Sequence, residues 1–285
     1  MFHFFSSVID RFLNPLQIGK KKSKKPAFII TKRQKFVSSV FLLAALLFAA
    51  EYIFSGYTVV IAIALGLLSD IVLGFSLLQD LQTNFNPQAF ILPFFCSLSF
   101  GLFYFLTPAR LISRIILTIL YAICLYSLFL SENIFVVAAS RTIALLNSAR
   151  IVTFVITLLS YFFLTNIILS LRLGFFPTIG FFLFLTIFFV YHSLWTHTLE
   201  RKITREILFW VGIITLCLVE LATVLWFWPT SPTVTALFLV AIFYIFIGLS
   251  HVWFDKRLFK TVFWEYAWVA VFATIILFWL TSWQG

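Results

Sequence analysis

The chain has 285 residues, of which 62% are hydrophobic and 11% charged, and its net charge is +10. This composition leaves too little polar surface for a soluble globular protein and excludes that class. Much of the positive charge lies in the first 35 residues, so anionic lipid headgroups are a nearer partner than nucleic acid.

The first segment in chain order is a cytoplasmic basic amphipathic arm, residues 1–35. Apolar side chains near helical spacing, such as Phe2, Phe5 and Ile9, indicate a short helix on the membrane surface. A run of basic residues without an acid follows it: Lys20, Lys21, Lys22, Lys24, Lys25, Lys32, Arg33 and Lys35. We expect these residues to contact anionic lipid and to keep the arm inside, because positive charges beside the first span stay cytoplasmic.

From residue 36 to residue 285 the sequence predicts one all-α domain, a polytopic transmembrane helical bundle. A helix needs about 20 apolar residues to cross the roughly 30 Å hydrocarbon layer, and runs of this length recur nine times. The expected spans are Phe36–Phe54, Tyr57–Leu78, Ala89–Leu106, Leu111–Leu130, Ile151–Leu171, Phe175–Trp195, Ile207–Trp228, Thr233–Phe254 and Val262–Trp283.

The segment Glu132–Arg150, between the fourth and fifth spans, is too polar to be counted as a span. Val136, Ala139, Ile143 and Leu146 form an apolar stripe at helical spacing. This stripe indicates an interfacial segment at 132–150 that lies along the cytoplasmic surface of the membrane.

Charge sets the orientation of the nine spans. With the basic arm inside, only Arg110, Arg114 and Arg172 of the 20 Lys and Arg residues fall on the outer side. Such a bias is typical of a correct topology, because Lys and Arg accumulate in cytoplasmic loops. We therefore expect the N-terminus inside and the C-terminus outside.

Ionisable residues within spans are the candidate functional residues, because each costs at least about 2.5 kcal/mol at a helix centre. Asp70 and Glu220 are expected about 4 Å to either side of the midplane. Asp70 also belongs to a row of small residues, Ala62, Gly66 and Gly74, and so should face protein. The pair predicts a proton, cation or substrate site between spans two and seven. The alternative is two protonated side chains, each hydrogen-bonded to its own neighbours.

A second polar level lies near the cytoplasmic ends of the spans and contains His192, His251, Asp255 and Glu265. Imidazoles and carboxylates can ligate a metal or exchange protons. Their spacing along the helices is poor for a metal, since only His251 and Asp255 share a helix face. We favour hydrogen-bonded interfacial residues here, and we assign neither a metal nor a catalytic residue.

Two acid–base partners are also expected on the outer side. Glu51 and Arg114 fall at matching depth on spans one and four, which predicts a structural ion pair, with a substrate clamp as the alternative. No GxxxxGK[ST], GxGxxG, GxSxG or HExxH motif occurs, so we expect no cofactor and no ATPase in the chain itself.

Five segments of the chain carry a resemblance to known proteins. They are GLFYFLTPAR (Gly101–Arg110), SENIFVVAASRTIALL (Ser131–Leu146), LSLRL (Leu169–Leu173), FWPTSPT (Phe227–Thr233) and RLFKTVFWEY (Arg257–Tyr266). Together they resemble an uncharacterised family of bacterial polytopic membrane proteins, over most of the chain from Phe36 onward. The resemblance implies an integral protein of the bacterial plasma (cytoplasmic) membrane and no activity, because these patterns have no assigned roles.

Three classes of function fit these observations. We favour a transporter-like or lipid-handling bundle that uses Asp70 and Glu220. The first alternative is a non-catalytic subunit or scaffold, which docks a membrane-protein partner on the basic arm and on the Glu132–Arg150 segment. The second is an intramembrane enzyme that uses the cytoplasmic-side His/Glu level. Against the transporter, nine spans do not divide into equal inverted halves and no internal sequence repeat is found. An enzyme is the least expected, because it should bring more His, Asp and Glu to one level.

Topology gives the first testable prediction. Reporter fusions or cysteine labelling should place Met1, Glu132–Arg150, Arg201–Arg205 and Asp255–Lys260 inside, and Ser55, Pro229–Pro232 and Gly285 outside. The distribution of Lys and Arg is the physical reason. A cytoplasmic Gly285 would contradict the count of nine spans.

Overall fold

The structure is a computed structural model that describes residues 32–53, 57–81, 87–107, 110–138, 145–199, 204–256 and 259–281. Most of the basic arm, including Lys20–Lys25, lies outside these residues, so its contact with anionic lipid stays a prediction. Only the last basic residues of the arm, Lys32, Arg33 and Lys35, belong to the first helix.

Within the described residues the protein is an all-α bundle with nine helices that are long and apolar enough to cross a membrane. The helices are α2 (Lys32–Ile53), α3 (Thr58–Leu81), α4 (Ile91–Leu106), α5 (Leu111–Ala138), α6 (Leu146–Ser170), α7 (Phe175–Thr198), α8 (Arg205–Trp226), α9 (Pro232–Phe254) and α10 (Lys260–Trp279). A 3₁₀ turn, η2 (Pro87–Phe90), precedes α4. Large apolar side chains such as Phe41 and Ile112 point outward, 74% exposed, as lipid-facing side chains do. The predicted fold class is confirmed.

The two described ends of the stretch 132–150 belong to two helices, and its expected place along the membrane surface stays a prediction. Helix α5 continues past Leu130 to Ala138, and α6 begins at Leu146. Glu132 and Phe135 are fully buried in the continuation of α5. A segment that is too polar to face lipid can still be helical when its polar residues face protein, and that is the arrangement of Glu132.

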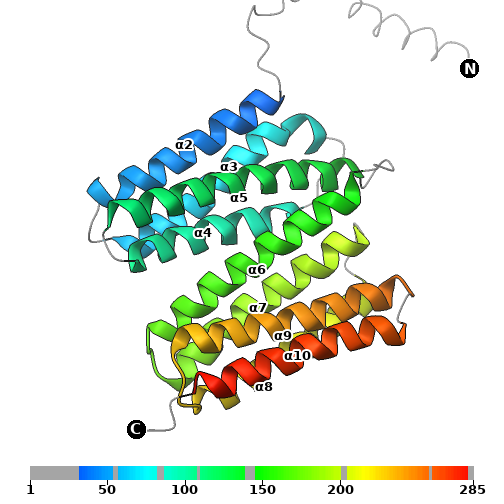
Figure 1. Ribbon diagram of the computed structural model, residues 1–285. Helices are drawn as coiled ribbons and strands as arrows, with labels where there is room; N and C mark the ends of the chain where they lie inside the picture. The colour runs from blue at the N-terminus through cyan, green and yellow to red at the C-terminus, as the bar shows by residue number, and fades with distance from the viewer. Residues whose placement is uncertain are drawn as a thin grey trace, which may run out of the picture.

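The helices form two units of four that repeat the same packing. In the first unit, α2 packs on α3 and α5, α3 on α4 and α5, and α4 on α5. In the second unit, α6, α7, α8 and α9 take the places of α2, α3, α4 and α5, and the same five pairs pack together. Figure 1 shows the first unit above the second. Because four helices return the chain to its starting side, the second unit has the same orientation as the first.

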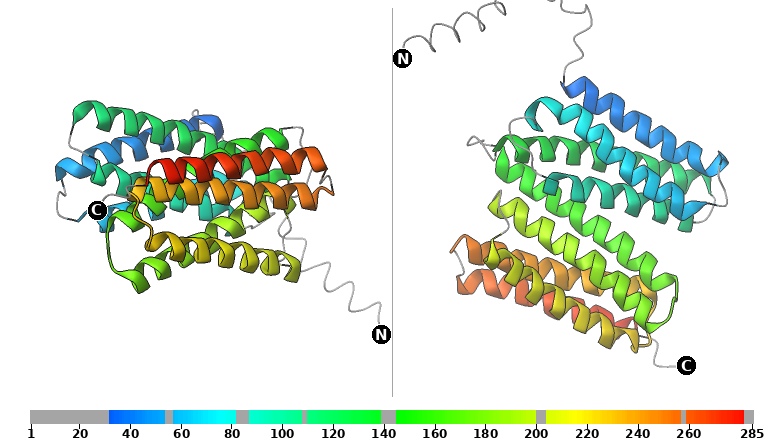
Figure 2. Two further views of the ribbon diagram at one scale, coloured as in Figure 1. Left: turned by 60° about the horizontal axis from the view of Figure 1, so that its bottom comes forward. Right: turned by 180° about the vertical axis from the view of Figure 1, so that it is seen from behind.

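Helix α6 joins the two units, since it packs on α4 and α5 as well as on its own neighbours, and α7 also touches α4. Helix α10 lies at the edge of the second unit against α9 (Figures 1 and 2). It approaches α9 closely at Gly248, where a Cβ atom would overlap the ring of Tyr266. The ninth helix is therefore an addition to a four-plus-four arrangement.

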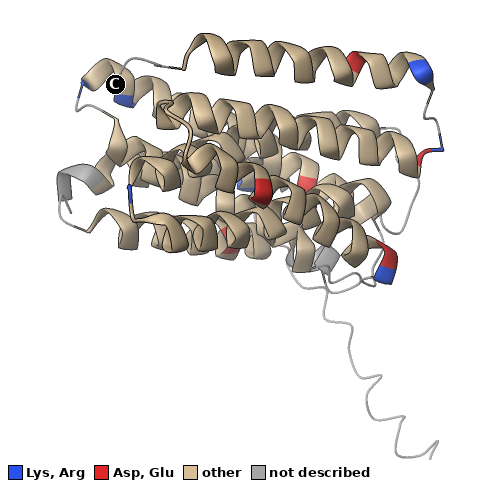
Figure 3. Ribbon diagram, turned by 90° about the horizontal axis from the view of Figure 1, so that it is seen from below, with Lys and Arg blue, Asp and Glu red and all other residues tan. Residues whose placement is uncertain are grey.

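Successive helices alternate in direction, so the bundle has two ends. We call the end at which α2 begins the Lys32 end, and the end at which α10 finishes the Trp279 end. Figure 3 shows that Lys and Arg lie mostly at the ends of the described helices, whereas several Asp and Glu residues lie along their middles. The acidic residues in the middles of the helices are the starting point for the candidate site.

A row of small residues on α3 packs closely against α4. A Cβ atom added to Gly101 of α4 would lie 3.1 Å from Cβ and 3.2 Å from Cα of Ala62 on α3. One added to Gly66 would lie 2.8 Å from the ring of Phe94. The hydroxyl of Ser69 donates to the carbonyl oxygen of Pro93 across the same contact, at 3.1 Å. This close approach turns the inner face of α3 toward protein.

The close approach can be tested with a matched pair of glycine substitutions. Gly101→Ala should destabilise the protein by about 1–3 kcal/mol, because the added methyl group meets the backbone of α3. Gly180→Ala on α7 is the control, because nothing lies within 4 Å of its added Cβ. Denaturant unfolding in detergent micelles measures both variants. Equal stability of the two variants would show that α3 and α4 do not pack this closely.

Candidate functional site

Glu132 on α5 and His192 on α7 pair in the interior, and a third ionisable side chain, Asp70 on α3, lies within electrostatic range of Glu132. Glu132 and His192 are 0% and 1% exposed, and Oε1 of Glu132 lies 3.3 Å from Nε2 of His192. This is an ion-pair distance, and neither Oε2 of Glu132 nor Nδ1 of His192 has a hydrogen-bond partner among the described residues. Asp70 is half-buried, its buried Oδ1 likewise has no described partner, and its carboxyl lies within electrostatic range of Glu132. We call these residues the buried acid–histidine cluster.

Charge neutrality limits the states of this cluster. It is neutral only when its three groups share two protons. Both acids can be protonated beside a neutral imidazole, or one proton can move to His192 and leave one carboxylate. The two arrangements differ by one proton transfer across the 3.3 Å between Glu132 and His192. Because an uncompensated charge in this interior is costly, further proton exchange needs a compensating charge or water.

The cluster lies where the two four-helix units meet. Asp70 and Glu132 come from the first unit, and His192 comes from the second. Nearby, the side-chain amide of Gln88 in η2 donates to the hydroxyl of Tyr191 on α7, at 3.2 Å. The ring of Trp195 lies 5.8 Å from that of His192 and forms an edge contact with Phe135 of α5 at 6.3 Å, measured between centroids. Polar and aromatic contacts thus cross between the units at this level.

A second group of polar side chains lies at the Lys32 end, within the second unit. The imidazoles of His197 and His251 stack with centroids 4.5 Å apart and planes 10° apart. Nε2 of His197 lies 3.0 Å from Oδ1 of Asp255, and Nε2 of His251 lies 3.1 Å from the carbonyl oxygen of Ser193. Because the two rings are parallel, their nitrogen atoms point outward side by side. The two imidazoles are therefore not directed at one metal ion. We call His197, His251, Asp255 and the adjacent Arg150 the end cluster.

Arg150 connects the end cluster to the last turn of α7. Its Nη2 donates to the carbonyl oxygen of His197 at 2.6 Å, and its Nε donates to that of Thr196 at 3.2 Å. The last carbonyl groups of a helix have no partner within the helix, so a cation there satisfies them and favours the helix dipole. Arg150 therefore fixes the end of α7, which carries both His192 and His197.

The structure divides the four residues that the sequence placed at one cytoplasmic level. His192 pairs with Glu132 in the interior, whereas His251 and Asp255 join the end cluster. Glu265 is exposed on α10 and joins neither group. Among the described residues, no group of three or more His, Cys, Asp or Glu side chains could hold a metal ion.

The structure also keeps Asp70 and Glu220 apart. Asp70 lies on α3 in the first unit, whereas Glu220 lies on α8, which packs on α7 and α9 of the second (Figures 1 and 2). Glu220 is exposed at the rim of a groove of about 470 Å³ between α7 and α8. The described contacts give the two residues different surroundings: Asp70 has Glu132 as its acidic neighbour, and Glu220 faces outward. The prediction that Asp70 faces protein agrees with its buried Oδ1.

The expected ion pair between Glu51 and Arg114 stays a prediction, because the side chain of Glu51 lies outside the described ones. Helices α2 and α5 do pack against each other, and Phe36 at the start of α2 meets Phe129 late in α5, at 6.2 Å between ring centroids. The two helices are thus antiparallel. This arrangement brings the end of α2, with Glu51, to the level at which α5 begins.

Sequence reasoning missed Glu132 because it ended the fourth span at Leu130. The signal that could have found it is helical periodicity. Leu125, Leu128, Glu132 and Phe135 follow one another at spacings of three or four residues, and all four are fully buried. The apolar face of α5 therefore continues through the carboxylate rather than stopping before it.

Comparison with known proteins identifies one family. A family model described as "Protein of unknown function (DUF5656)" matches residues 52–280. The chain belongs to this family. The match to the DUF5656 family covers the buried acid–histidine cluster, the end cluster and Glu220. This match to an uncharacterised family agrees with the resemblance that the five sequence segments carry. No curated protein and no solved structure matches the chain.

The role of Arg150 in this DUF5656 protein gives a testable prediction. Arg150→Ala should destabilise the end of α7 by about 1.5–3 kcal/mol, because it removes two charge-assisted hydrogen bonds. Hydrogen exchange should therefore become faster in the last turn of α7. Arg205→Ala, at the exposed start of α8, is the control and should leave that turn unchanged. Unchanged exchange in Arg150→Ala would show that the guanidinium does not hold this helix end.

Proposed function

We propose that the protein is a proton-coupled membrane transporter, in which the buried acid–histidine cluster binds and releases the coupling proton between two four-helix units. One observation carries this proposal. Glu132 and His192, from different units, lie 3.3 Å apart at 0% and 1% exposure. An acid and a base at this distance can exchange a proton whenever their surroundings change.

Stability does not account for such a pair. Removing an acid and an imidazole from water costs several kcal/mol per charge, and apolar side chains of the same volume often stabilise a protein at least as well. Within a membrane span, ionisable residues are functional candidates by default, above all in proton relays. The neighbouring Asp70 adds a second carboxyl, which is unfavourable for a purely structural pair and useful for holding a variable number of protons.

The architecture supports the same proposal. Many transporters consist of two repeated halves, with substrate and ion sites at their interface, and they work by rocking one half against the other. Such repeats can be parallel as well as inverted. The units α2–α5 and α6–α9 share five packing pairs and one orientation, and the cluster lies between them. A parallel repeat in packing answers the objection that nine spans do not divide into inverted halves.

The enzyme alternative loses support for a specific reason. An intramembrane enzyme would require the histidines and carboxylates near the Lys32 end to lie at one depth and to act together. His192 is instead paired with Glu132, Glu265 is exposed, and His197 and His251 bond to Asp255 and a backbone carbonyl. No metal-binding group of three or more His, Cys, Asp or Glu side chains among the described residues joins them.

The proposal predicts that Glu132 exchanges its proton with water from both sides of the membrane. Infrared difference spectra of the protein in sealed liposomes should show a carboxyl band that responds to a pH step on either side. Glu132→Gln should remove this band, because the amide keeps the shape but does not ionise. His192→Gln should shift the pH at which the band changes, because the imidazole is its closest ionisable neighbour.

Glu265→Gln is the matched control, since it removes an exposed carboxyl on α10. It should leave the Glu132 band and its pH dependence unchanged. A static structural pair would not respond to a pH step on either side, and that result would overturn the proposal. A response from one side alone would show a proton-binding site without the alternating access of a transporter.

A further inference from the structure

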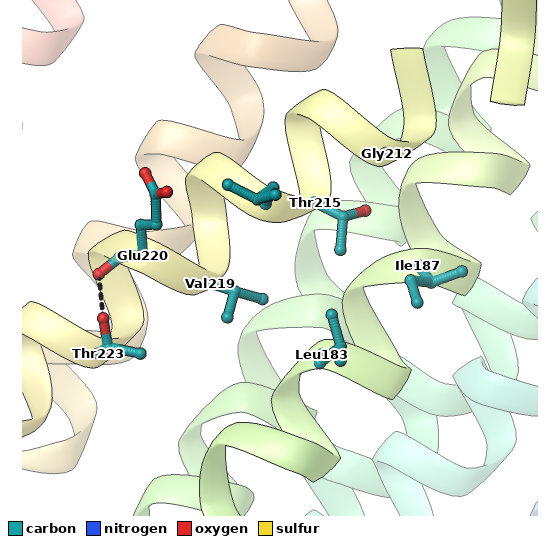
Figure 4. A pocket seen from close by; sticks show the side chains of 8 residues that line it. Leu183, Ile187, Gly212, Thr215, Val219, Glu220 and Thr223 are labelled. Atoms are coloured by element: carbon teal, nitrogen blue, oxygen red, sulfur yellow. Dashed lines mark hydrogen bonds between the residues drawn. The ribbon is translucent and has the colours of Figure 1, made fainter. Parts of the chain in front are cut away.

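Glu220 is a carboxylate on the outer surface of the bundle. It is exposed on α8, and the hydroxyl of Thr223 donates to its backbone carbonyl oxygen at 2.6 Å, whereas no hydrogen bond or ion pair of its carboxyl is among the described contacts. In Figure 4 its side chain points away from Leu183 and Ile187 of α7. The carboxylate therefore has no described partner within the chain.

The depth of Glu220 makes this exposure unfavourable in a single copy. It lies about 7 Å from the middle of α8, at about 1.5 Å per residue, and so within the roughly 30 Å hydrocarbon layer. Polar groups at this depth normally face a protein interior or a water-filled cavity. Lipid chains offer no hydrogen bond, so the carboxyl needs a partner that the described part of this chain does not supply.

The face of α8 around Glu220 can accept another helix. Gly212 and Leu216 precede Glu220 at intervals of four residues and lie on the same exposed face. A Cβ atom added at Gly212 would meet nothing within 4 Å. Small residues at such a position let a second backbone come close. Leu216 and Val224, 58% and 59% exposed, flank the carboxyl with apolar surface.

We propose that a second copy of this chain packs on this face of α8 about a two-fold axis, so that the two Glu220 carboxyls hydrogen-bond to each other. A neutral carboxyl has one donor and one acceptor, so two of them satisfy each other completely. In a two-fold interface a residue near the axis meets its own copy, which suits a self-complementary group. A cationic partner would instead require a Lys or Arg at the same depth in another protein.

The test compares three variants of the full chain in liposomes. Each is labelled with one fluorophore per copy, and single-molecule photobleaching counts the copies per particle as the protein is diluted in lipid. The wild-type protein should be dimeric. Glu220→Leu should weaken dimerisation about tenfold, because it removes the paired carboxyls. Glu220→Gln should remain dimeric, because an amide also carries both donor and acceptor.

Glu265→Leu is the control, since it removes an exposed carboxyl from α10 and should leave the dimer intact. A wild-type protein that is monomeric at every dilution would overturn the proposal and leave lipid as the occupant of this face. A Glu220→Leu variant as dimeric as the wild type would overturn it as well, because the contact would then lie elsewhere. Loss of the dimer in Glu220→Gln would exclude the self-paired carboxyls.

Discussion

The absence of water in the hydrocarbon layer is the constraint on which this structure depends. Backbone groups there must bond within their own segment, so each crossing is a helix. The same constraint acts on side chains: the hydroxyls of Thr157, Thr186 and Thr274 donate to the carbonyl four residues earlier in their own helices. Acids and imidazoles cannot be satisfied so locally. They need partners on other helices, and their positions therefore mark where helices meet for a reason beyond packing.

The sequence predicted the number of helices because the length of an apolar run reflects the thickness of the membrane. It placed the end of α5 too early, because an apolar-run criterion treats a polar stretch as a boundary. That criterion measures how well a segment tolerates lipid on all sides. Glu132 touches no lipid, so its segment remains helical, and its burial follows the periodicity set by Leu125 and Leu128. Hydropathy indicates whether a segment tolerates lipid, whereas periodicity indicates which helix face is buried. For the end of α5, periodicity was the better predictor.

The partners of the acidic residues could not be predicted from depth. Depth is one coordinate, and two residues at the same depth can lie on helices that never touch. Asp70 and Glu220 were matched by depth, yet α3 and α8 belong to different units. The side of a helix that faces protein could partly be predicted, since the small residues beside Asp70 indicated a protein-facing side. The order in which helices neighbour one another comes only from the fold, and that order brings His192 to Glu132.

The interface between the two units differs at its two ends. Toward the Lys32 end it combines polar contacts, the Glu132–His192 pair and the bond from Gln88 to Tyr191, with the edge contact of Trp195 and Phe135. Toward the Trp279 end it is closed by rings, where Phe163 of α6 stacks on Phe103 at 4.2 Å between centroids and meets Phe100 edge-on at 5.1 Å. In the proposed transporter, a relative motion of the two units must part the stacked rings of Phe103 and Phe163 to open the Trp279 end.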